Sequence, residues 1–234
     1  MEDILLRLTE RQKKITGMLD KSQCAADIGC DHGRLGAYLI QSGIAQSVIA
    51  ADISEKSLDK ARSLARRLNI ENKMQFRQGD GLKVLHKGEA QSVVIAGLSG
   101  VTIVGMLNNG DVLESVYILQ PMSEAYRLRG ALPDMGFEIL DEGIVREHNG
   151  RTRFYEIIKC RWDGLKRSPE KGMFLYVPRA PLVRQDCEMK GFLEYRLEVC
   201  QRALKQMQKG GRLNEGAELK KQAEFYREGL KWLK

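Results

Sequence analysis

Acidic residues and glycines between positions 24 and 35 have the spacing of a ligand-binding turn. The stretch 24–35 reads CAADIGCDHGRL, an apolar run that breaks into Gly-x-x-x-Gly and then resumes with helical character. This pattern predicts a strand, a tight turn and a helix start, a junction that binds anionic or polar cofactors in many proteins. Gly29 would let the backbone approach a cofactor, and Asp27 would accept a hydrogen bond from an ammonium group or an ordered water. Taken alone, the pattern also fits a turn in another α/β protein.

A second acid follows at the distance that nucleotide-binding units use. Residues 47–53 form another apolar run that contains Asp52, about 20 residues beyond the glycine turn. An acid at this place accepts hydrogen bonds from ribose hydroxyls. Two motifs in register arise by chance much less often than one, so together they favour a bound nucleotide or nucleoside.

The motifs resemble those of class I S-adenosylmethionine (SAM) methyltransferases. The series DIGCDHG at 27–33 is similar to the first motif of that class, an acid followed by glycines at every second position, with Asp31 in place of one glycine. The series QGDG at 78–81 follows the β-type run 74–77, where the class places an acid, here Asp80, against the cofactor adenine. The resemblance implies SAM rather than a dinucleotide, with a nucleotide-binding or non-catalytic relative as the alternative.

Composition agrees with a globular protein that has a polyanionic partner. The chain has 234 residues, of which 43% are hydrophobic and 29% charged, enough for one α/β domain and a small appendage. Lys and Arg number 38 against 31 Asp and Glu, which gives a formal charge of +7. Many basic proteins bind no nucleic acid, so the charge suggests this partner without deciding it.

The cysteines and the N-terminal sequence point to the cytoplasm. The five cysteines form no Cys-x-x-Cys pair, which argues against a disulfide framework and a zinc site and fits a reducing compartment. Glu2 and Asp3 interrupt the N-terminal apolar residues, unlike in a signal peptide, and no segment approaches the ~20 apolar residues of a membrane span. We expect a soluble, cytoplasmic protein without a membrane partner and without a bound metal.

The order of periodic segments predicts a parallel sheet with right-handed crossovers. A helix over residues 3–19 is expected to cover the sheet near the cofactor site, and Ser54 is expected to cap the helix that follows it. Pro121 is expected to end the fifth strand, because proline cannot donate to the ladder. Residues 137–145 and 153–161 read as a hairpin joined by the turn His148-Asn149-Gly150. The remaining predicted strands are 92–96 and 115–119, and the remaining predicted helices are 35–40, 101–107 and 124–132.

The last 71 residues differ in character from the rest. Three of the five prolines lie between 163 and 181, which predicts a linker over 164–183 between a SAM-binding domain (1–163) and a C-terminal domain (184–234). Beyond it, apolar residues recur at steps of four and three on both sides of Gly210-Gly211, which predicts an antiparallel, coiled-coil-like helical hairpin. Residues 184–234 hold 12 Lys and Arg against 8 Asp and Glu, which fits an RNA-facing surface or an ordinary solvated face.

Taken whole, the chain resembles the bacterial tRNA (adenine-22 N1)-methyltransferase family. The matching segments are ADIGCDH at 26–32, VIAG at 94–97 with Gly100, ILQP at 118–121, LR at 128–129, GFEI at 136–139 and FYEII at 154–158. The resemblance implies an α/β class I methyltransferase fold with a seven-stranded, mostly parallel sheet. It also implies methyl transfer from SAM to N1 of an adenine in tRNA.

The resemblance assigns roles to individual residues. The implied cofactor-binding residues are Asp27, Gly29, Asp52, Ile53, Asp80, Gly81, Ala96 and Gly97. The implied catalytic residues are Asp31, His32 and Gln120. Asp31 and His32 would stabilise the charged product or receive a proton from the exocyclic amine, and Gln120 would contact the base. His32 could instead only cap the helix start.

Two departures from the family leave other functions open. The family typically has Ala-Gly-Met-Gly-Gly where this chain has AGLSG at 96–100, and Gln-Pro-Asn where it has QPM at 120–122. Ser99 and Met122 would lie at the edge of the sheet where substrate meets cofactor. A SAM-binding module that binds RNA or another partner without this activity, and a small-molecule methyltransferase, are therefore the alternatives.

Overall fold

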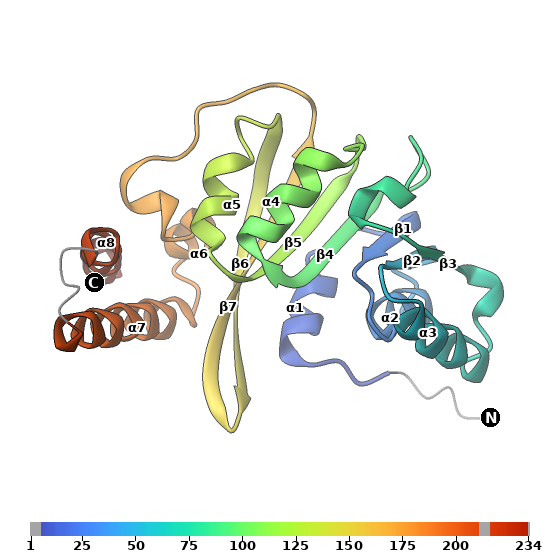
Figure 1. Cartoon of the computed structure of the whole chain (residues 1–234), viewed down its shortest axis with the longest axis horizontal. Coiled ribbons are helices and arrows are strands. Elements are labelled where there is room, and N and C mark those ends of the chain that lie inside the picture. The colour runs from blue at the N-terminus through green and yellow to red at the C-terminus, as the bar shows by residue number, and fades with distance from the viewer. Residues whose placement is uncertain (1–5, 211–215, 234) are drawn as a thin grey trace.

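The computed structural model describes residues 6–210 and 216–233, and its centre is one seven-stranded sheet (Figure 1). The strand order is β3-β2-β1-β4-β5-β7-β6. The parallel strands are β1 (Ser22–Ile28), β2 (Ala45–Asp52), β3 (Met74–Gln78), β4 (Ser92–Ser99) and β5 (Val116–Ser123), and β6 (Phe137–Asn149) and β7 (Arg151–Trp162) form the antiparallel pair. The predicted mostly parallel sheet and its terminal hairpin are confirmed.

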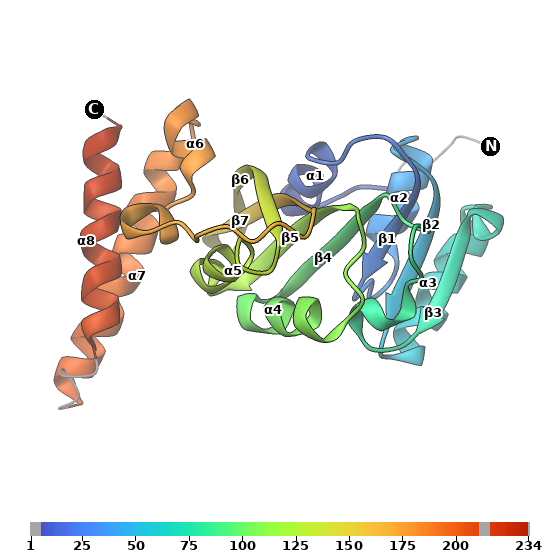
Figure 2. The ribbon, with the colours of Figure 1, turned by 90° about the horizontal axis from the view of Figure 1, so that it is seen from above.

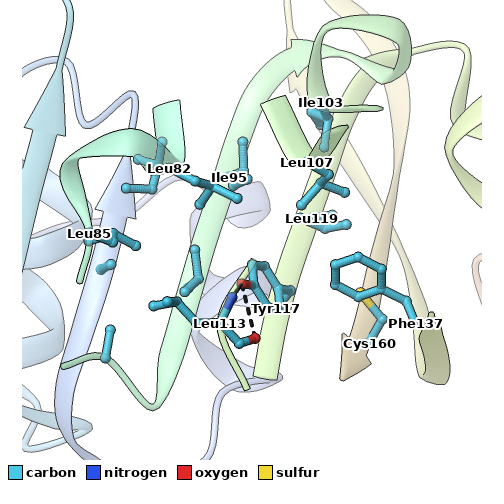
Figure 3. Close-up of a cluster of buried hydrophobic side chains, with 14 of the residues drawn as sticks. Leu82, Leu85, Ile95, Ile103, Leu107, Leu113, Tyr117, Leu119, Phe137 and Cys160 are labelled. Carbon is cyan, nitrogen blue, oxygen red and sulfur yellow. Dashed lines mark hydrogen bonds between the residues drawn. The ribbon is translucent and has the colours of Figure 1, made fainter. Parts of the chain in front are cut away.

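Helices bury both faces of the sheet. One face packs against α4 (Gly100–Asn109), α5 (Ala125–Ala131) and the 3₁₀ helix η2 (Gly81–Val84). Figure 3 shows the cluster on this face, where the Tyr117 hydroxyl donates to the Leu113 carbonyl and accepts from its N–H. The other face packs against α1 (Glu10–Gly17), α2 (Arg34–Gln41) and α3 (Glu55–Arg67), while η1 (Glu71–Lys73) precedes β3. Adjacent strand residues alternate between these clusters, as the pleat requires.

The sequence predicted the start of α3 correctly but predicted a longer helix than α1. The Ser54 hydroxyl accepts a hydrogen bond from the N–H of Ser57 and caps α3, as predicted. α1 is shorter than the predicted helix over 3–19: it begins after Thr9, whose capping box with Gln12 fixes the start, and residues 1–5 lie outside the described part.

β5 does not end at Pro121, and this prediction is wrong. The strand runs on to Ser123, with Pro121 opposite Leu98 at an irregularity in the β4–β5 register. On its other side β5 pairs with β7 only as far as Leu119. The missing N–H of Pro121 therefore removes no hydrogen bond between β5 and β7.

The C-terminal helices form the predicted hairpin at one end of the molecule, opposite α3 (Figures 1 and 2). They are α7 (Met189–Lys209), whose C-cap is Gly210, and α8 (Ala217–Trp232), while Gly211 lies outside the described part. The segment 164–183, expected as a linker, contains η3 (Gly172–Leu175) and all of α6 (Arg179–Arg184) except its last residue. Its apolar side chains share one buried cluster with the hairpin, so this segment is packed against it. No helix of the described residues is long and apolar enough to cross a membrane.

Arg129 joins the sheet to this C-terminal region. It is 1% exposed, and its guanidinium donates to Glu142 on β6 and Glu156 on β7, both at 2.7 Å. It also donates to the carbonyl of Leu175 at 2.9 Å, while Glu142 accepts from the backbone N–H of Arg179 at 2.7 Å. One buried cation therefore holds two strands and the segment that leads to the hairpin.

Replacing Arg129 by Met should destabilise the fold strongly, because two buried carboxylates lose their counter-charge. We expect a loss of about 3–5 kcal/mol in the free energy of unfolding, measured by urea denaturation. Arg127→Met on the same helix is the control, since Arg127 is exposed and pairs with Glu124 only at the surface, which should cost below about 1 kcal/mol. Equal losses in both variants would contradict a special role for Arg129.

Candidate functional site

A cavity of about 310 Å³ lies at the carboxyl ends of β1 and β4. It is lined by side chains from α1, from the β1–α2 turn and from the end of β4. Six of the predicted site residues lie on it: Asp27, Gly29, Asp31, His32, Ala96 and Gly97. Asp52, Ile53, Asp80, Gly81 and Gln120 are not part of its lining. The predicted site is thus brought together in part within one cavity.

The β1–α2 turn explains the alternating glycines of the motif. Gly29, Asp31 and Gly33 all have left-handed backbone conformations, with φ of 74°, 49° and 66°. Aspartate is one of the few other residues that adopt this conformation readily, so Asp31 can replace a glycine here. A Cβ at Gly29 would meet nothing within 4 Å, and the same holds for Gly97. Both backbones therefore border open space that a ligand can fill.

Asp52 ties the ends of β1 and β2 together. Its Oδ2 accepts from the N–H of Asp31 at 3.0 Å, and its Oδ1 accepts from the N–H of Ser54 at 2.9 Å. Each carboxylate oxygen keeps a further lone pair that can accept from a hydroxyl. The neighbouring Ile53 is 74% exposed, which offers an apolar surface beside this acid.

Asp80 and Gly81 lie at the same edge of the sheet but outside the cavity. Asp80 forms an exposed ion pair with Lys83 at 2.6 Å. Gly81 has φ of 59°, and a Cβ there would approach Met106 to 3.3 Å. Neither residue lines the cavity, so their role in cofactor binding stays a prediction.

Asp27 is a buried acid without a cationic partner among the described residues. It is 4% exposed and accepts from the N–H of Gly36 at 3.2 Å. Burial raises its pKa to about 7; the Gly36 hydrogen bond opposes the rise, and the nearby Asp52 adds to it. A cation in the cavity would favour the ionised carboxylate, so this site is suited to an ammonium group.

The cavity offers neither a reactive thiol nor a metal-ligand cluster. Burial, with Asp27 and Asp52 nearby, raises the pKa of the Cys30 thiol, which keeps it protonated. Within 6–210 and 216–233, no three His, Cys, Asp or Glu residues lie together as a candidate metal site.

Gln120 has a different position from that expected of a base contact. Its side chain is fully buried; Oε1 accepts from the N–H of Gly97 at 3.2 Å, and Nε2 donates to the carbonyl of Pro121 at 2.8 Å. The side chain therefore holds Gly97 at the irregularity in the β4–β5 register. Its neighbour Met122 is 40% exposed, with its sulfur 2.7 Å from Nη1 of Arg11.

His32 lies at the edge of the cavity and faces α3. Its Nε2 is 2.9 Å from the ammonium of Lys60 and 3.4 Å from a carboxylate oxygen of Asp31. If Nε2 accepts from Lys60, it is occupied, so His32 could receive a proton from a substrate only after this contact breaks.

Arg11 and Gln12 line the cavity, and sequence reasoning gave neither a role. The Arg11 guanidinium lies 5.0 Å from the ring centre of Tyr155, and its backbone N–H donates to Glu147 at 3.3 Å. The available signal was a basic residue within a helix expected beside the cofactor site.

Comparison with protein families and curated proteins agrees with this geometry. A family profile described as "Methyltransferase domain" matches residues 8–158. The chain is 31% identical over 156 residues to the tRNA (adenine(22)-N(1))-methyltransferase of Bacillus subtilis, a match over 65% of this chain and 64% of that protein. It is 33% identical over 129 residues to a putative tRNA methyltransferase of Mycoplasma pneumoniae, which covers 54% of this chain and 59% of that protein. These sequence matches span less than two thirds of each relative.

Solved structures match over nearly the whole chain. The crystal structure of the B. subtilis M1A22 tRNA methyltransferase TrmK matches with a TM-score of 0.78 and 26% identity, over 96% of this chain and 99% of that one. A putative tRNA (m1A22) methyltransferase of Streptococcus pneumoniae, solved with S-adenosyl-L-methionine, matches with a TM-score of 0.81 and 22% identity, over 96% of this chain and 100% of that one. The predicted fold and the predicted resemblance are confirmed.

Asp27 should make the stability of the ligand-free protein pH-dependent. Its folded pKa of about 7 exceeds the ordinary 3.8, so its contribution is fully present below about pH 4 and is lost as pH rises through about 7. Asp27→Asn keeps an acceptor for Gly36 without the charge, and should gain up to about 4 kcal/mol over the natural protein by pH 8. Thermal unfolding across pH measures this, with the exposed Asp134→Asn as control; a pH-independent gain would contradict the assignment.

Proposed function

The chain belongs to the methyltransferase domain family, and we propose that it transfers a methyl group from SAM to N1 of an adenine in tRNA. The observation that carries the cofactor half is the buried Asp27, which has no cationic partner in the described part of the chain and lies in a cavity bordered by open glycine backbone. The likeness to an adenine-22 N1-methyltransferase supports the acceptor half. A tRNA substrate also implies that the protein works in the cytoplasm.

The residues present fit the separate parts of SAM. The cofactor has an ammonium and a carboxylate at one end and an adenosine at the other. Asp27 suits the ammonium, and Arg11, a cation on the same cavity, suits the carboxylate. Asp52 has lone pairs for the ribose hydroxyls, and the exposed Ile53 offers an apolar face for the adenine. Asp80 and Gly81 border the continuation of this path.

Methyl transfer requires that the acceptor nitrogen is aligned with the methyl group and that the positive charge on the acceptor is stabilised. When bound, SAM supplies an electrophilic methyl group on a sulfonium sulfur. As the acceptor nitrogen gains the methyl group it becomes cationic, and the carboxylate of Asp31, which lines the cavity, would stabilise that charge. The adenine must leave its stack to reach the cavity, and Met122 supplies an exposed, polarizable side chain against which a base can pack.

The departure at Ser99 has a structural explanation that does not require another substrate. Its hydroxyl accepts from the N–H of Thr102 at 3.1 Å and so caps α4. The side chain is occupied at the helix start and does not line the cavity. This weakens the reasons for a binding-only module or a small-molecule enzyme.

We further propose that the N-terminal and C-terminal parts of the chain have different functions. Residues 1–163 would bind SAM and the acceptor nucleotide, and the helical hairpin of 184–234 would contact tRNA with its excess of basic residues. Residues 164–183 would join the two parts, held by their contacts with Arg129 and with the hairpin.

Asp52→Ala should weaken SAM binding by about 1.5–3 kcal/mol, the scale for a hydrogen bond to a charged group. This corresponds to a Kd roughly 10- to 100-fold higher, measured by calorimetry. Asp111→Ala, a change at an exposed acid, should leave the affinity unchanged. Unchanged affinity in the Asp52 variant would remove this residue from the ribose role.

The reaction itself is tested by mass spectrometry of tRNA digested after incubation with the protein and SAM. We expect N1-methyladenosine to accumulate with the natural protein and to form much more slowly with Asp52→Ala at low SAM, because fewer molecules carry the cofactor. Raising SAM should restore much of the rate. If the natural protein binds SAM but leaves every tRNA adenine unmethylated, the proposed function is wrong.

A further inference from the structure

A second cavity adjoins the first on the side of α3. Its volume is about 560 Å³, and we call it the α3 groove; five basic residues line it (His32, Arg34, Lys56, Lys60 and Arg67), together with one acid, Asp59, and with Ser63 and Leu64. Lys56, Lys60 and Arg67 recur at steps of four and seven, so they share one face of the helix. With a rise of 1.5 Å per residue, Lys56 and Arg67 are about 16 Å apart along the helix.

The positive charge of this face is not neutralised by the acids of the same helix. α3 carries five basic and two acidic residues. Both acids, Glu55 and Asp59, bond to Arg62, at 2.6 and 2.9 Å. Among the described residues, Lys56 and Arg67 form no ion pair, and the close neighbour of the Lys60 ammonium is the His32 ring at 2.9 Å. The α3 groove therefore has basic side chains that are free to bind an anion.

The α3 groove is continuous with the cofactor cavity. His32 and Arg34 line both. Arg34 is fixed at the junction because its Nη2 donates to the carbonyl of Arg7 at 2.9 Å. An anion in the groove therefore lies next to whatever enters the cavity beside Asp31.

The position of α3 in the molecule favours a large partner. Figures 1 and 2 show α3 and the α7–α8 hairpin at opposite ends of the long axis, with the sheet between them. A small anion would occupy one end only. A partner that reaches from the groove past the cavity towards the hairpin must be a macromolecule with repeated negative charge, which describes a folded RNA.

We propose that the α3 groove binds backbone phosphates of the RNA strand that carries the acceptor nucleotide. This inference rests on the proposed function, since it takes RNA as the substrate. The groove acts as a second contact, separate from the helical hairpin, and it holds the strand while its base enters the cavity. Such contacts position the RNA without reading its sequence.

The test uses the full chain with Lys56→Gln and Arg67→Gln combined. These residues lie outside the cofactor cavity, so SAM affinity measured by calorimetry should not change. The Kd for tRNA, measured by fluorescence anisotropy over a series of KCl concentrations, should rise roughly tenfold near physiological salt. The slope of log K against log salt should fall by about 1.5, which corresponds to two lost phosphate contacts.

A matched control removes the same charge elsewhere. Lys87→Gln with Lys166→Gln changes two exposed lysines near the amino-terminal edge of the sheet, away from the cavity. This variant should keep the Kd for tRNA within twofold and the slope unchanged. Equal losses in both variants would show a general charge effect and overturn the proposal, as would a groove variant that binds tRNA like the natural protein.

Two further results separate this proposal from others. If the groove variant lost affinity for inorganic phosphate but kept its affinity for tRNA, the groove would be a small-anion site and the proposal would be wrong. Failure of the proposed function appears differently, as absence of methyl transfer by the natural protein. The groove is still judged in that case, because RNA binding and its salt dependence are measured without the reaction.

Discussion

Parallel pairing of β1 with both β2 and β4 is the constraint from which the site follows. Ile28, the last residue of β1, is paired with Ala51 on one side and Ile95 on the other. β1 and β2 therefore end at nearly the same level, and β4 runs beside β1 and on to Ser99. Gly29 follows β1, Asp52 is the last residue of β2 and Gly97 lies near the end of β4, so residues far apart in sequence meet at one edge of the sheet.

The buried acids Glu142, Glu156 and Asp27 differ in whether the fold supplies a cationic partner. Acids that have one stabilise the fold, whereas an acid without one is suited to bind a cationic ligand. Glu142 and Glu156 share the guanidinium of Arg129, so their charge is balanced within the fold. Asp27 has a backbone donor but no cation among the described residues, and burial raises its pKa to about 7. The folded chain alone thus disfavours the charged form that a cationic ligand needs, and ligand binding recovers that cost.

Sequence predicted those parts of the site that follow from local pattern. Asp27, Gly29 and Asp52 could be proposed because a strand end, a left-handed turn and a fixed spacing are all recognisable within a short stretch, and the structure brings the three residues to one edge of the sheet. Arg11 could not be assigned, since its place over Tyr155 depends on how α1 packs on distant β7. The prolines of the segment 164–183 did not reveal its helix for a related reason: Pro178 is the N-cap of α6 and Pro181 lies in its first turn, where proline is tolerated.

The two departures from the family pattern differ in consequence once their contacts are known. Ser99 satisfies the N–H of Thr102 and belongs to the start of α4, so its effect is on the helix. Met122 lies beside Arg11 and near the amide of Gln120, at 2.7 and 3.8 Å. Arg11 in turn lines the cavity, so a change at Met122 alters the cavity through the Arg11 side chain. Under the proposed function, a change at Met122 would therefore act on the acceptor through the packing of α1 against the end of β5, whereas a change at Ser99 would act on the start of α4.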